Sequence, residues 1–373
     1  MTPEIMRENL PKIAFLLGNT STNGGIERVT SILSDELTEK GFAKIYAIGF
    51  QPKECEPVYE WNKKITIFDL LVKRESMKTG IFKAIIRLRR YLKNNNIDIL
   101  VACGHRYAPL AGLATVGTNT KMIYWSHSSF YGEIDTFKKF NEHFGSLISN
   151  VVVPLTKTDE QNYRNKTRAK KVIQIYNPID EHLLNHNIPY NPNTKRIISV
   201  GRLDHPKNFE SHLLEVAKIV LTNNPEYTWH IYGKGGLESI IKSNIEKEGL
   251  TGRVILEGNV NNLYNLYSGY SLMVMTSSYE GFPMTLIEGM AKKLPLVSFD
   301  VQTGPNEIIQ DNLNGFLIPP FNLNLMAQRI DELIHDQDMR IKFSEANKTL
   351  IENYKIDVII DQWATLIKSL VNK

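Results

Sequence analysis

The 373-residue sequence is poor in cysteine, and its two cysteines, Cys55 and Cys103, match no spacing of a metal or redox site. This argues against a disulfide framework. No run of about 18 apolar residues occurs, so we expect no membrane-spanning helix. The apolar stretch 13–17 is followed by loop residues and no small-residue cleavage site, which favours a first strand over a signal peptide. We therefore expect a cytoplasmic location.

Charge is distributed unevenly along the chain, although the net value is only +4. Residues 1–178 hold 26 Lys and Arg against 17 Asp and Glu, whereas the remainder holds 18 against 23. A basic first half favours an anionic membrane surface or a phosphate-bearing substrate, and we expect no nucleic-acid partner.

The cations concentrate in 81–93, where apolar residues recur at helical spacing. This pattern predicts a crossover helix that packs its apolar residues on its own sheet and leaves a basic face in solvent. The residues expected inside are Phe82, Ile85, Ile86 and Leu92. Contact of the helix with a membrane is left open as an added role.

Short apolar runs alternate with amphipathic helical stretches along the chain. The predicted strands are 12–17, 44–50, 65–68, 98–102, 121–125, 150–154 and 171–176, followed by 196–200, 228–232, 253–256, 271–275, 295–299 and 315–318. Buried runs that do not alternate, separated by helices, predict parallel sheets with helices on both faces. At this length two α/β domains are expected, each with a doubly wound sheet, and they would enclose a cleft beyond the carboxyl ends of their strands.

Two glutamates, Glu280 and Glu288, stand with seven residues between them in the run 277–291. Pro283 suits the first helical position and good helix formers follow it, so Glu280 is expected on a loop and Glu288 inside a helix. The two carboxylates would then face one ligand from two depths. Free N–H groups at the start of the helix would hold a phosphate between them.

A second candidate segment, 200–208, follows the first strand of the second half and contains Arg202 and Lys207. Arginine offers a planar fork to phosphate oxygens and lysine offers a compact charge. Cations fixed in advance stabilise negative charge that develops on a phosphate group. Gly201 would let the backbone come close.

Further candidates lie in the first half. Gly24 and Gly25 stand between a strand and a helix, where N–H groups favour an anion, although such a pair is often a simple turn. His127 and the pair His105 and Arg106 each follow a predicted strand, which places them at the cleft edge. A structural role for these three residues remains an alternative.

Asp336-Gln337-Asp338 has a metal-binding form, but its position between amphipathic segments favours a helix junction, and we predict no metal.

In order and placement these motifs resemble the retaining glycosyltransferases of family 4, which have the two-domain GT-B fold, over nearly the whole chain. The resemblance implies an acceptor-binding domain 1–178, a nucleotide-sugar-binding domain 179–355, and a final segment 356–373 whose helix crosses back to the first domain. Residues 177–180 resemble the family's hinge.

The resemblance also assigns roles. It implies that Glu280 contacts donor-sugar hydroxyls, that Glu288 bonds the ribose, and that Arg202 and Lys207 clamp the diphosphate. His127 would lie near the anomeric carbon, so the predicted catalytic residues are Glu280, His127, Arg202 and Lys207. His105, Arg106 and His127 would face the acceptor. The predicted donor contacts are Gly24, Gly25, Gly201, Arg202, Lys207, Gly233, Lys234, Val260, Glu280, Gly281, Phe282, Pro283, Met284, Thr285, Leu286 and Glu288.

The implied reaction transfers a hexosyl unit from a nucleotide sugar to a glycan hydroxyl with retention of configuration. Front-face attack is favoured, because no carboxylate is evident as a nucleophile. Residues 299–309 resemble the variant in enzymes of lipopolysaccharide, capsule and lipid-linked oligosaccharide assembly that use UDP-Gal, UDP-GalNAc or UDP-GlcNAc. Those relatives often have cysteine in place of Val301, and GDP-mannose stays open.

The acceptor cannot be read from the sequence: a lipid-linked saccharide at the inner face of the plasma membrane and a soluble sugar phosphate both fit. No cofactor is expected. Two rival functions are a nucleotide-sugar 2-epimerase of the same architecture and a non-catalytic nucleotide-sugar-binding partner subunit.

Overall fold

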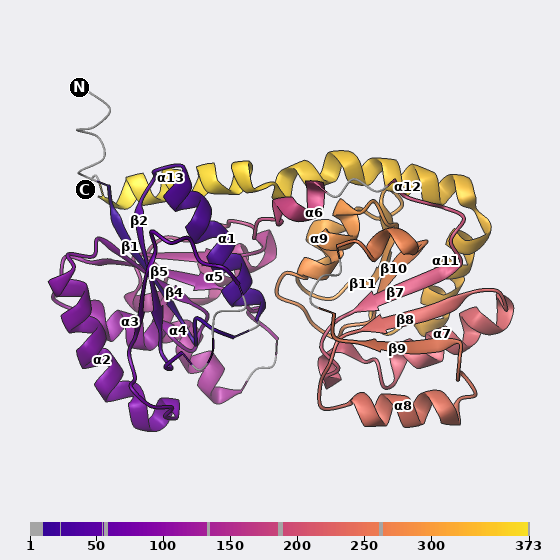
Figure 1. Cartoon of the computed structure of the whole chain (residues 1–373), viewed down its shortest axis with the longest axis horizontal. Helices are drawn as coiled ribbons and strands as arrows, with labels where there is room; N and C mark the ends of the chain where they lie inside the picture. Colours follow the sequence, from indigo (N-terminus) through magenta and orange to yellow (C-terminus); the bar gives the residue numbers. More distant parts are fainter. Residues whose placement is uncertain are drawn as a thin grey trace. The chain divides into compact units, whose positions relative to one another are not determined.

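The computed structural model describes residues 10–371, except 23, 54, 56–58, 133–134, 186–188 and 261–263. The chain divides into two compact units: unit 1 comprises residues 1–178 and 356–373, and unit 2 comprises residues 179–355. These bounds coincide with the domain limits expected from the sequence. Each unit contains a six-stranded parallel sheet covered by helices (Figure 1), which confirms the predicted doubly wound α/β architecture.

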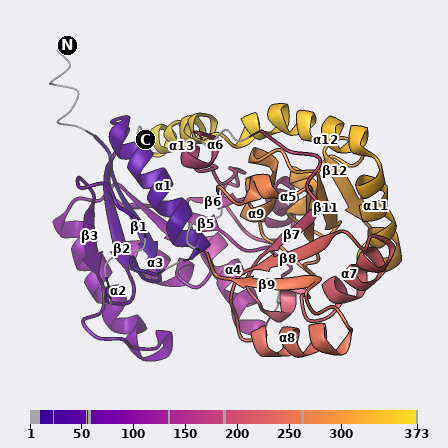
Figure 2. The same ribbon diagram turned by 45° about the vertical axis from the view of Figure 1, so that its right-hand side comes forward.

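The sheet of unit 1 has the strand order β3-β2-β1-β4-β5-β6. Its strands are β1 Lys12–Leu17, β2 Lys44–Gly49, β3 Thr66–Asp69, β4 Ile99–Cys103, β5 Lys121–Ser126 and β6 Val151–Pro154. Its helices are α1 Gly25–Glu39, α2 Met77–Asn94, α3 Ala108–Thr115, α4 Thr136–Ile148, α5 Lys157–Lys166 and α13 Ile356–Val371. Right-handed crossovers place α2, α3 and α4 on one face, where α3 contacts both neighbours, and α1 with α13 on the other (Figure 2).

Helix α13 belongs to unit 1, as the resemblance implied for the final segment 356–373. Its Trp363 is fully buried, and the ring centroid lies 5.0 Å from that of Trp125 and 6.4 Å from that of Phe15. The last helix is therefore part of the core of unit 1, because its largest side chain fills the space beside β1 and β5.

The sheet of unit 2 has the order β12-β11-β10-β7-β8-β9. Its strands are β7 Arg196–Val200, β8 Thr228–Tyr232, β9 Val254–Gly258, β10 Leu272–Met275, β11 Leu296–Phe299 and β12 Gly315–Ile318. Its α-helices are α6 Glu181–Asn185, α7 His212–Asn223, α8 Glu238–Lys247, α9 Met284–Ala291, α10 Pro305–Ile308, α11 Leu323–His335 and α12 Gln337–Leu350, and its short 3₁₀ helices are η1 His205–Lys207, η2 Tyr267–Gly269 and η3 Ile351–Tyr354.

Most of the predicted strands are confirmed to within two residues, but segment 171–176 is an exception. Val172 forms only an isolated bridge with Val152. The next pair keeps only one of its two bonds, because the Ile175 N–H donates to the Pro154 carbonyl oxygen at 3.2 Å but Pro154 has no N–H to donate in return. The ladder therefore stops after one bridge.

The junction expected at Asp336 is confirmed. Asp336 follows α11 and caps α12, where its Oδ1 accepts from the Met339 N–H at 2.8 Å. Within the described residues no helix is both long and apolar enough to cross a bilayer.

The predicted inner face of α2 is confirmed for Leu92, which is buried, and for Ile85, which packs against the core, but it is wrong for Phe82 and Ile86. The buried positions are Gly80, Ala84, Leu88 and Leu92, whereas Phe82 and Ile86 are 75% and 59% exposed. Small residues allow the helix to approach the core closely: a Cβ on Gly80 would lie 2.9 Å from Leu71 Cδ1. Gly80 and Ala84 were missed because glycine and alanine give little apolar signal.

Candidate functional site

Unit 2 brings Lys207 and Glu280 together at the carboxyl ends of neighbouring strands. Lys207 ends η1 after β7, Glu280 follows β10, and β7 pairs with β10 in the sheet. The Lys207 ammonium forms an ion pair with Glu280 Oε1, and the two side chains are only 17% and 12% exposed. A largely desolvated charge pair at this edge is a costly arrangement for stability alone and a useful one for binding a polar ligand.

The two loops that carry this pair are bonded to each other. The Ser278 N–H donates to the Pro206 carbonyl oxygen at 2.8 Å, and Thr276 Oγ1 donates to the Lys207 carbonyl oxygen at 2.8 Å. Asn208 has a left-handed backbone, with φ of 54°, and its Nδ2 donates to Thr276 O and Ser278 Oγ, both at 2.8 Å. Lys207 and Glu280 are therefore positioned by a rigid framework.

Arg202 lies apart from this ion pair. Its side chain is 80% exposed, and Nη1 lies 3.1 Å from Asp204 Oδ2. Gly201 lies beside the Lys207 side chain, and a Cβ at position 201 would lie 3.3 Å from both Cδ and Cε of Lys207. The glycine leaves room for the lysine chain to cross the end of β7.

The loop after β8 approaches the loop after β7 closely. Gly233 has φ of 143°, and a Cβ there would lie 1.8 Å from the Gly201 carbonyl oxygen, so this position accepts only glycine. The Lys234 carbonyl oxygen accepts from the Leu203 N–H at 3.0 Å, and the lysine side chain is exposed. Val260, beyond β9, is also exposed.

Helix α9 begins one residue later than predicted, because Pro283 is its N-cap and Met284 its first residue. Glu280 is on the loop and Glu288 inside the helix, as expected. Glu288 is 5% exposed, and Tyr267 OH donates to its Oε2 at 2.7 Å. The other predicted donor contacts of this segment, Gly281, Phe282, Pro283, Met284, Thr285 and Leu286, are partly or fully buried.

Unit 1 has a pocket of about 290 Å³ at the carboxyl ends of its strands. Its lining includes the predicted residues His105, Arg106 and His127. It also includes Glu27 and Tyr107, which the sequence analysis missed. Gly24 caps α1 and Gly25 is its first residue, so neither lies on a free loop.

Glu27 could have been found from its place in α1. It is the third helical residue, from which a glutamate side chain reaches back to the N-cap. A Cβ on Gly24 would lie 2.1 Å from Glu27 Oε2, so the carboxylate folds over the glycine. Burial raises the pKa of this carboxyl group.

Both histidines of the pocket are neutral near pH 7. Burial lowers the pKa of His127 to about 3, and burial with the charges of Lys138 and Arg106 lowers that of His105 to about 4. His127 Nε2 is buried without a hydrogen-bond partner among the described residues. A neutral imidazole nitrogen without a partner can donate to, or accept from, a ligand hydroxyl.

Buried polar side chains of α4 and α5 hold the segment 126–132 that carries His127. Lys138 Nζ donates to the Ser129 and Gly132 carbonyl oxygens, and Asp159 accepts from the Phe130 N–H at 3.2 Å. Glu142 accepts from the hydroxyl of Tyr163, which lies 2.9 Å from Ser126 Oγ. The position of His127 thus depends on a polar network beneath it.

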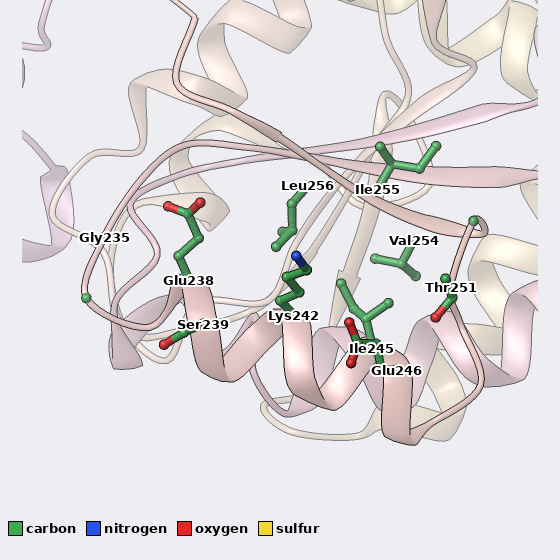
Figure 3. A pocket seen from close by; sticks show the side chains of 12 residues that line it. Gly235, Glu238, Ser239, Lys242, Ile245, Glu246, Thr251, Val254, Ile255 and Leu256 are labelled. Carbon is green, nitrogen blue, oxygen red and sulfur yellow. The ribbon is translucent and has the colours of Figure 1, made fainter.

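A larger cavity of about 800 Å³ lies between α8 and the edge strand β9 (Figure 3). Lys242, Ile245 and Leu256 line its middle. None of the predicted site residues lines it, so it is separate from the Lys207–Glu280 pair. Within the described residues no group of three His, Cys, Asp or Glu could hold a metal ion.

Comparison with known proteins identifies the family. Residues 184–350 match the family model described as glycosyl transferases group 1, and residues 23–183 match that described as glycosyltransferase family 4. The O-antigen biosynthesis glycosyltransferase WbnH of Escherichia coli is 31% identical over 284 residues, which are 73% of this chain and 78% of that protein. The chain therefore belongs to glycosyltransferase family 4 and is a glycosyltransferase.

Two further similarities cover almost the whole chain. A Campylobacter jejuni protein named GalNAc-alpha-(1->4)-GalNAc-alpha-(1->3)-diNAcBac-PP-undecaprenol alpha-1,4-N-acetyl-D-galactosaminyltransferase is 24% identical, covering 97% of this chain and 99% of that protein. The fold matches a crystal structure of a Staphylococcus aureus TarM mutant in complex with Fondaparinux, alpha-GlcNAc-glycerol and UDP, with a TM-score of 0.81, 17% identity and coverage of 96% and 100%. The predicted GT-B fold is confirmed.

Proposed function

We propose that this protein is a retaining hexosyltransferase that moves a sugar from a UDP-hexose to a hydroxyl of a growing bacterial surface glycan. The observation that carries the proposal is the partly buried Lys207–Glu280 ion pair at the carboxyl ends of β7 and β10. Ligands of doubly wound sheets bind beyond the carboxyl ends of the strands, so this pair stands where a donor would bind.

When the donor binds, it replaces the contact between Lys207 and Glu280 with contacts of its own to each side chain. The Lys207 ammonium turns to the diphosphate, and the Glu280 carboxylate accepts hydrogen bonds from sugar hydroxyls. Arg202, whose side chain is exposed, closes on the same phosphates. Glu288 bonds the ribose, and the backbone from Gly258 to Val260 receives the base.

Charge compensation by side chains makes a metal unnecessary. Lys207 and Arg202 stabilise the diphosphate as it leaves, and no metal or other cofactor takes part. A donor of α configuration then gives an α product with retention, through front-face attack in which the leaving phosphate takes the acceptor proton. The α linkage in the name of the Campylobacter relative supports this outcome.

The acceptor binds to unit 1, in the pocket that contains His105, Arg106 and His127. Neutral His127 orients the attacking hydroxyl through Nε2. We favour a lipid-linked saccharide over a soluble sugar phosphate, because the name of one near full-length relative specifies an undecaprenol-linked acceptor. This acceptor places the enzyme at the cytoplasmic face of the plasma membrane.

A donor panel tests the proposal. UDP-Gal, UDP-GalNAc, UDP-GlcNAc and GDP-mannose are each incubated with the protein, and nucleotide release is measured with and without lipid-linked oligosaccharides. We expect acceptor-dependent release of UDP and a mass gain of one hexosyl unit on the acceptor. Isomerisation of UDP-GlcNAc without an acceptor would instead identify an epimerase, and absence of turnover with every pair would support a non-catalytic binding subunit.

A further inference from the structure

Helix α4 presents polar residues to the interior of unit 1 and apolar residues to solvent. Its buried positions are Lys138, Asn141, Glu142, Gly145 and Ser146. Its exposed positions include Phe137, Phe140 and Leu147, which are 56%, 58% and 44% exposed. An amphipathic helix of a globular protein normally has the reverse orientation. Anchoring of the segment 126–132 explains the polar interior, but it does not explain phenylalanines on the outside.

Helices α2 and α3 extend this apolar exterior. Phe82 and Ile86 of α2 face solvent, and Leu113 of α3 is 43% exposed. Because α3 packs against both α2 and α4 on one face of the sheet, the outer sides of the three helices form one surface (Figure 1). Three of the four exposed phenylalanines among the described residues belong to it.

The α2 part of this surface is basic, although Glu75 just before the helix forms an ion pair with Lys83. Helix α2 contains no Asp or Glu, and its cations are Lys78, Lys83, Arg87, Arg89, Arg90 and Lys93. Exposed aromatic side chains flanked by cations are complementary to an anionic bilayer, where the rings enter the headgroup region and the cations meet lipid phosphates. A second copy of the chain fits less well, because a two-fold contact through α2 would bring these cations together.

We propose that the outer surface of α2, α3 and α4 docks on an anionic lipid bilayer, with Phe82, Phe137 and Phe140 in the headgroup region. This proposal rests on the proposed function, because docking would hold the unit that carries the histidine pocket at the membrane, where a lipid-linked acceptor is located. Its test requires neither donor nor acceptor, so its failure is distinct from failure of the proposed transferase activity.

Vesicle flotation tests the docking. Binding of the full chain is measured to vesicles of phosphatidylcholine alone and of phosphatidylcholine with phosphatidylglycerol. We expect binding only to the anionic vesicles, with at least tenfold weakening in Phe137→Ser/Phe140→Ser and in Arg90→Glu/Lys93→Glu. Matched controls in unit 2, Ile240→Ser/Ile341→Ser and Lys242→Glu/Lys247→Glu, should bind as the wild type does.

Circular dichroism and UDP affinity are measured for every variant, so that a folding defect is recognised. Phe140→Trp gives a second readout that needs no loss of function: its emission should shift to shorter wavelength when anionic vesicles are added. No binding to either vesicle, or equal loss in the unit 2 controls, would overturn the proposal. Self-association that Phe137→Ser/Phe140→Ser abolishes, without vesicle binding, would instead make this face a contact between copies.

Discussion

Lys207 and Glu280 are 73 positions apart in the sequence, and the structure joins them in an ion pair. The sequence placed each on a loop after a strand, but their contact could not be derived, because it depends on β10 pairing with β7 and not with β9. Glu27 differs, since its place as the third residue of α1 could have been recognised, although its contribution to the pocket of unit 1 could not. The sequence therefore predicted which residues lie at the ends of strands, but not which side chains contact one another.

Substitution of Glu280 should affect the transfer rate and the UDP affinity differently, because Glu280 is paired with Lys207. Glu280→Gln removes the negative charge but keeps the shape, so Lys207 is released to bind phosphate. We expect transfer to fall by about 100-fold or more, while UDP affinity stays the same or increases. Initial rates and calorimetric titration with UDP measure the two quantities, with Glu246→Gln on the exposed side of α8 as a control. Full activity in Glu280→Gln would remove its assigned role.

At the scale of elements, the strands were the most predictable part, because buried apolar runs bounded by loops are distinctive. Faces of helices were less predictable. The inner side of α2 uses Gly80 and Ala84, and that of α4 uses Lys138 and Glu142, so a search for apolar stripes finds only part of the inner face of α2 and would select the wrong face of α4. The prediction of a strand at 171–176 was wrong because the pairing of this segment with β6 ends after one bridge.

The crossing of the loops after β7 and β8 leads to a prediction about Gly233. A methyl group there would overlap the Gly201 carbonyl oxygen, so Gly233→Ala should lower the free energy of unfolding of unit 2 by about 2 kcal/mol or more and weaken UDP binding. Gly236→Ala, on the same loop with nothing within 4 Å, should change stability by less than about 0.5 kcal/mol. Urea unfolding compares the two, and equal effects would contradict the close approach.

The network beneath the His127 segment should give unit 1 a characteristic pH dependence. Burial raises the pKa of Glu142 from 4.5 to about 7, although hydrogen bonds from Tyr124 and Tyr163 oppose the shift. The folded state therefore holds this proton more tightly, and the resulting stability is complete below about pH 4.5 and lost as the pH rises through about 7. Titration of His105 and His127 has the opposite sign, since their lowered pKa values cost stability as the pH falls.

Glu142→Gln isolates the carboxyl contribution. Relative to this variant, the wild type should lose on the order of 2–3 kcal/mol of unfolding free energy between pH 5 and pH 8. Hydrogen exchange of unit 1 at both pH values measures the difference, with Glu246→Gln as the control. A difference that does not change with pH would show that Glu142 does not hold its proton as described.

At the scale of the whole molecule, the rhythm of strands and helices was enough to predict two doubly wound units, whereas the return of the last helix to the first was implied by the resemblance to glycosyltransferase family 4. The limit at 178 matches the point where that rhythm pauses, whereas the limit at 355 was implied by the resemblance. The apolar exterior of α2 and α4 could not be foreseen, because it depends on which side of each helix the sheet covers. The side of a helix that packs on the sheet is set by the fold, so it cannot be predicted from the periodicity of the sequence alone.

The central claim is that unit 2 binds a nucleoside diphosphate through Lys207 at the ends of β7 and β10. Calorimetric titration with UDP tests it directly, using the wild type, Lys207→Met and the control Lys242→Met, which removes a lysine from the cavity beside α8. The account predicts saturable binding that Lys207→Met weakens at least tenfold and Lys242→Met leaves unchanged. Absence of binding to any nucleoside diphosphate, or full affinity in Lys207→Met, would contradict it.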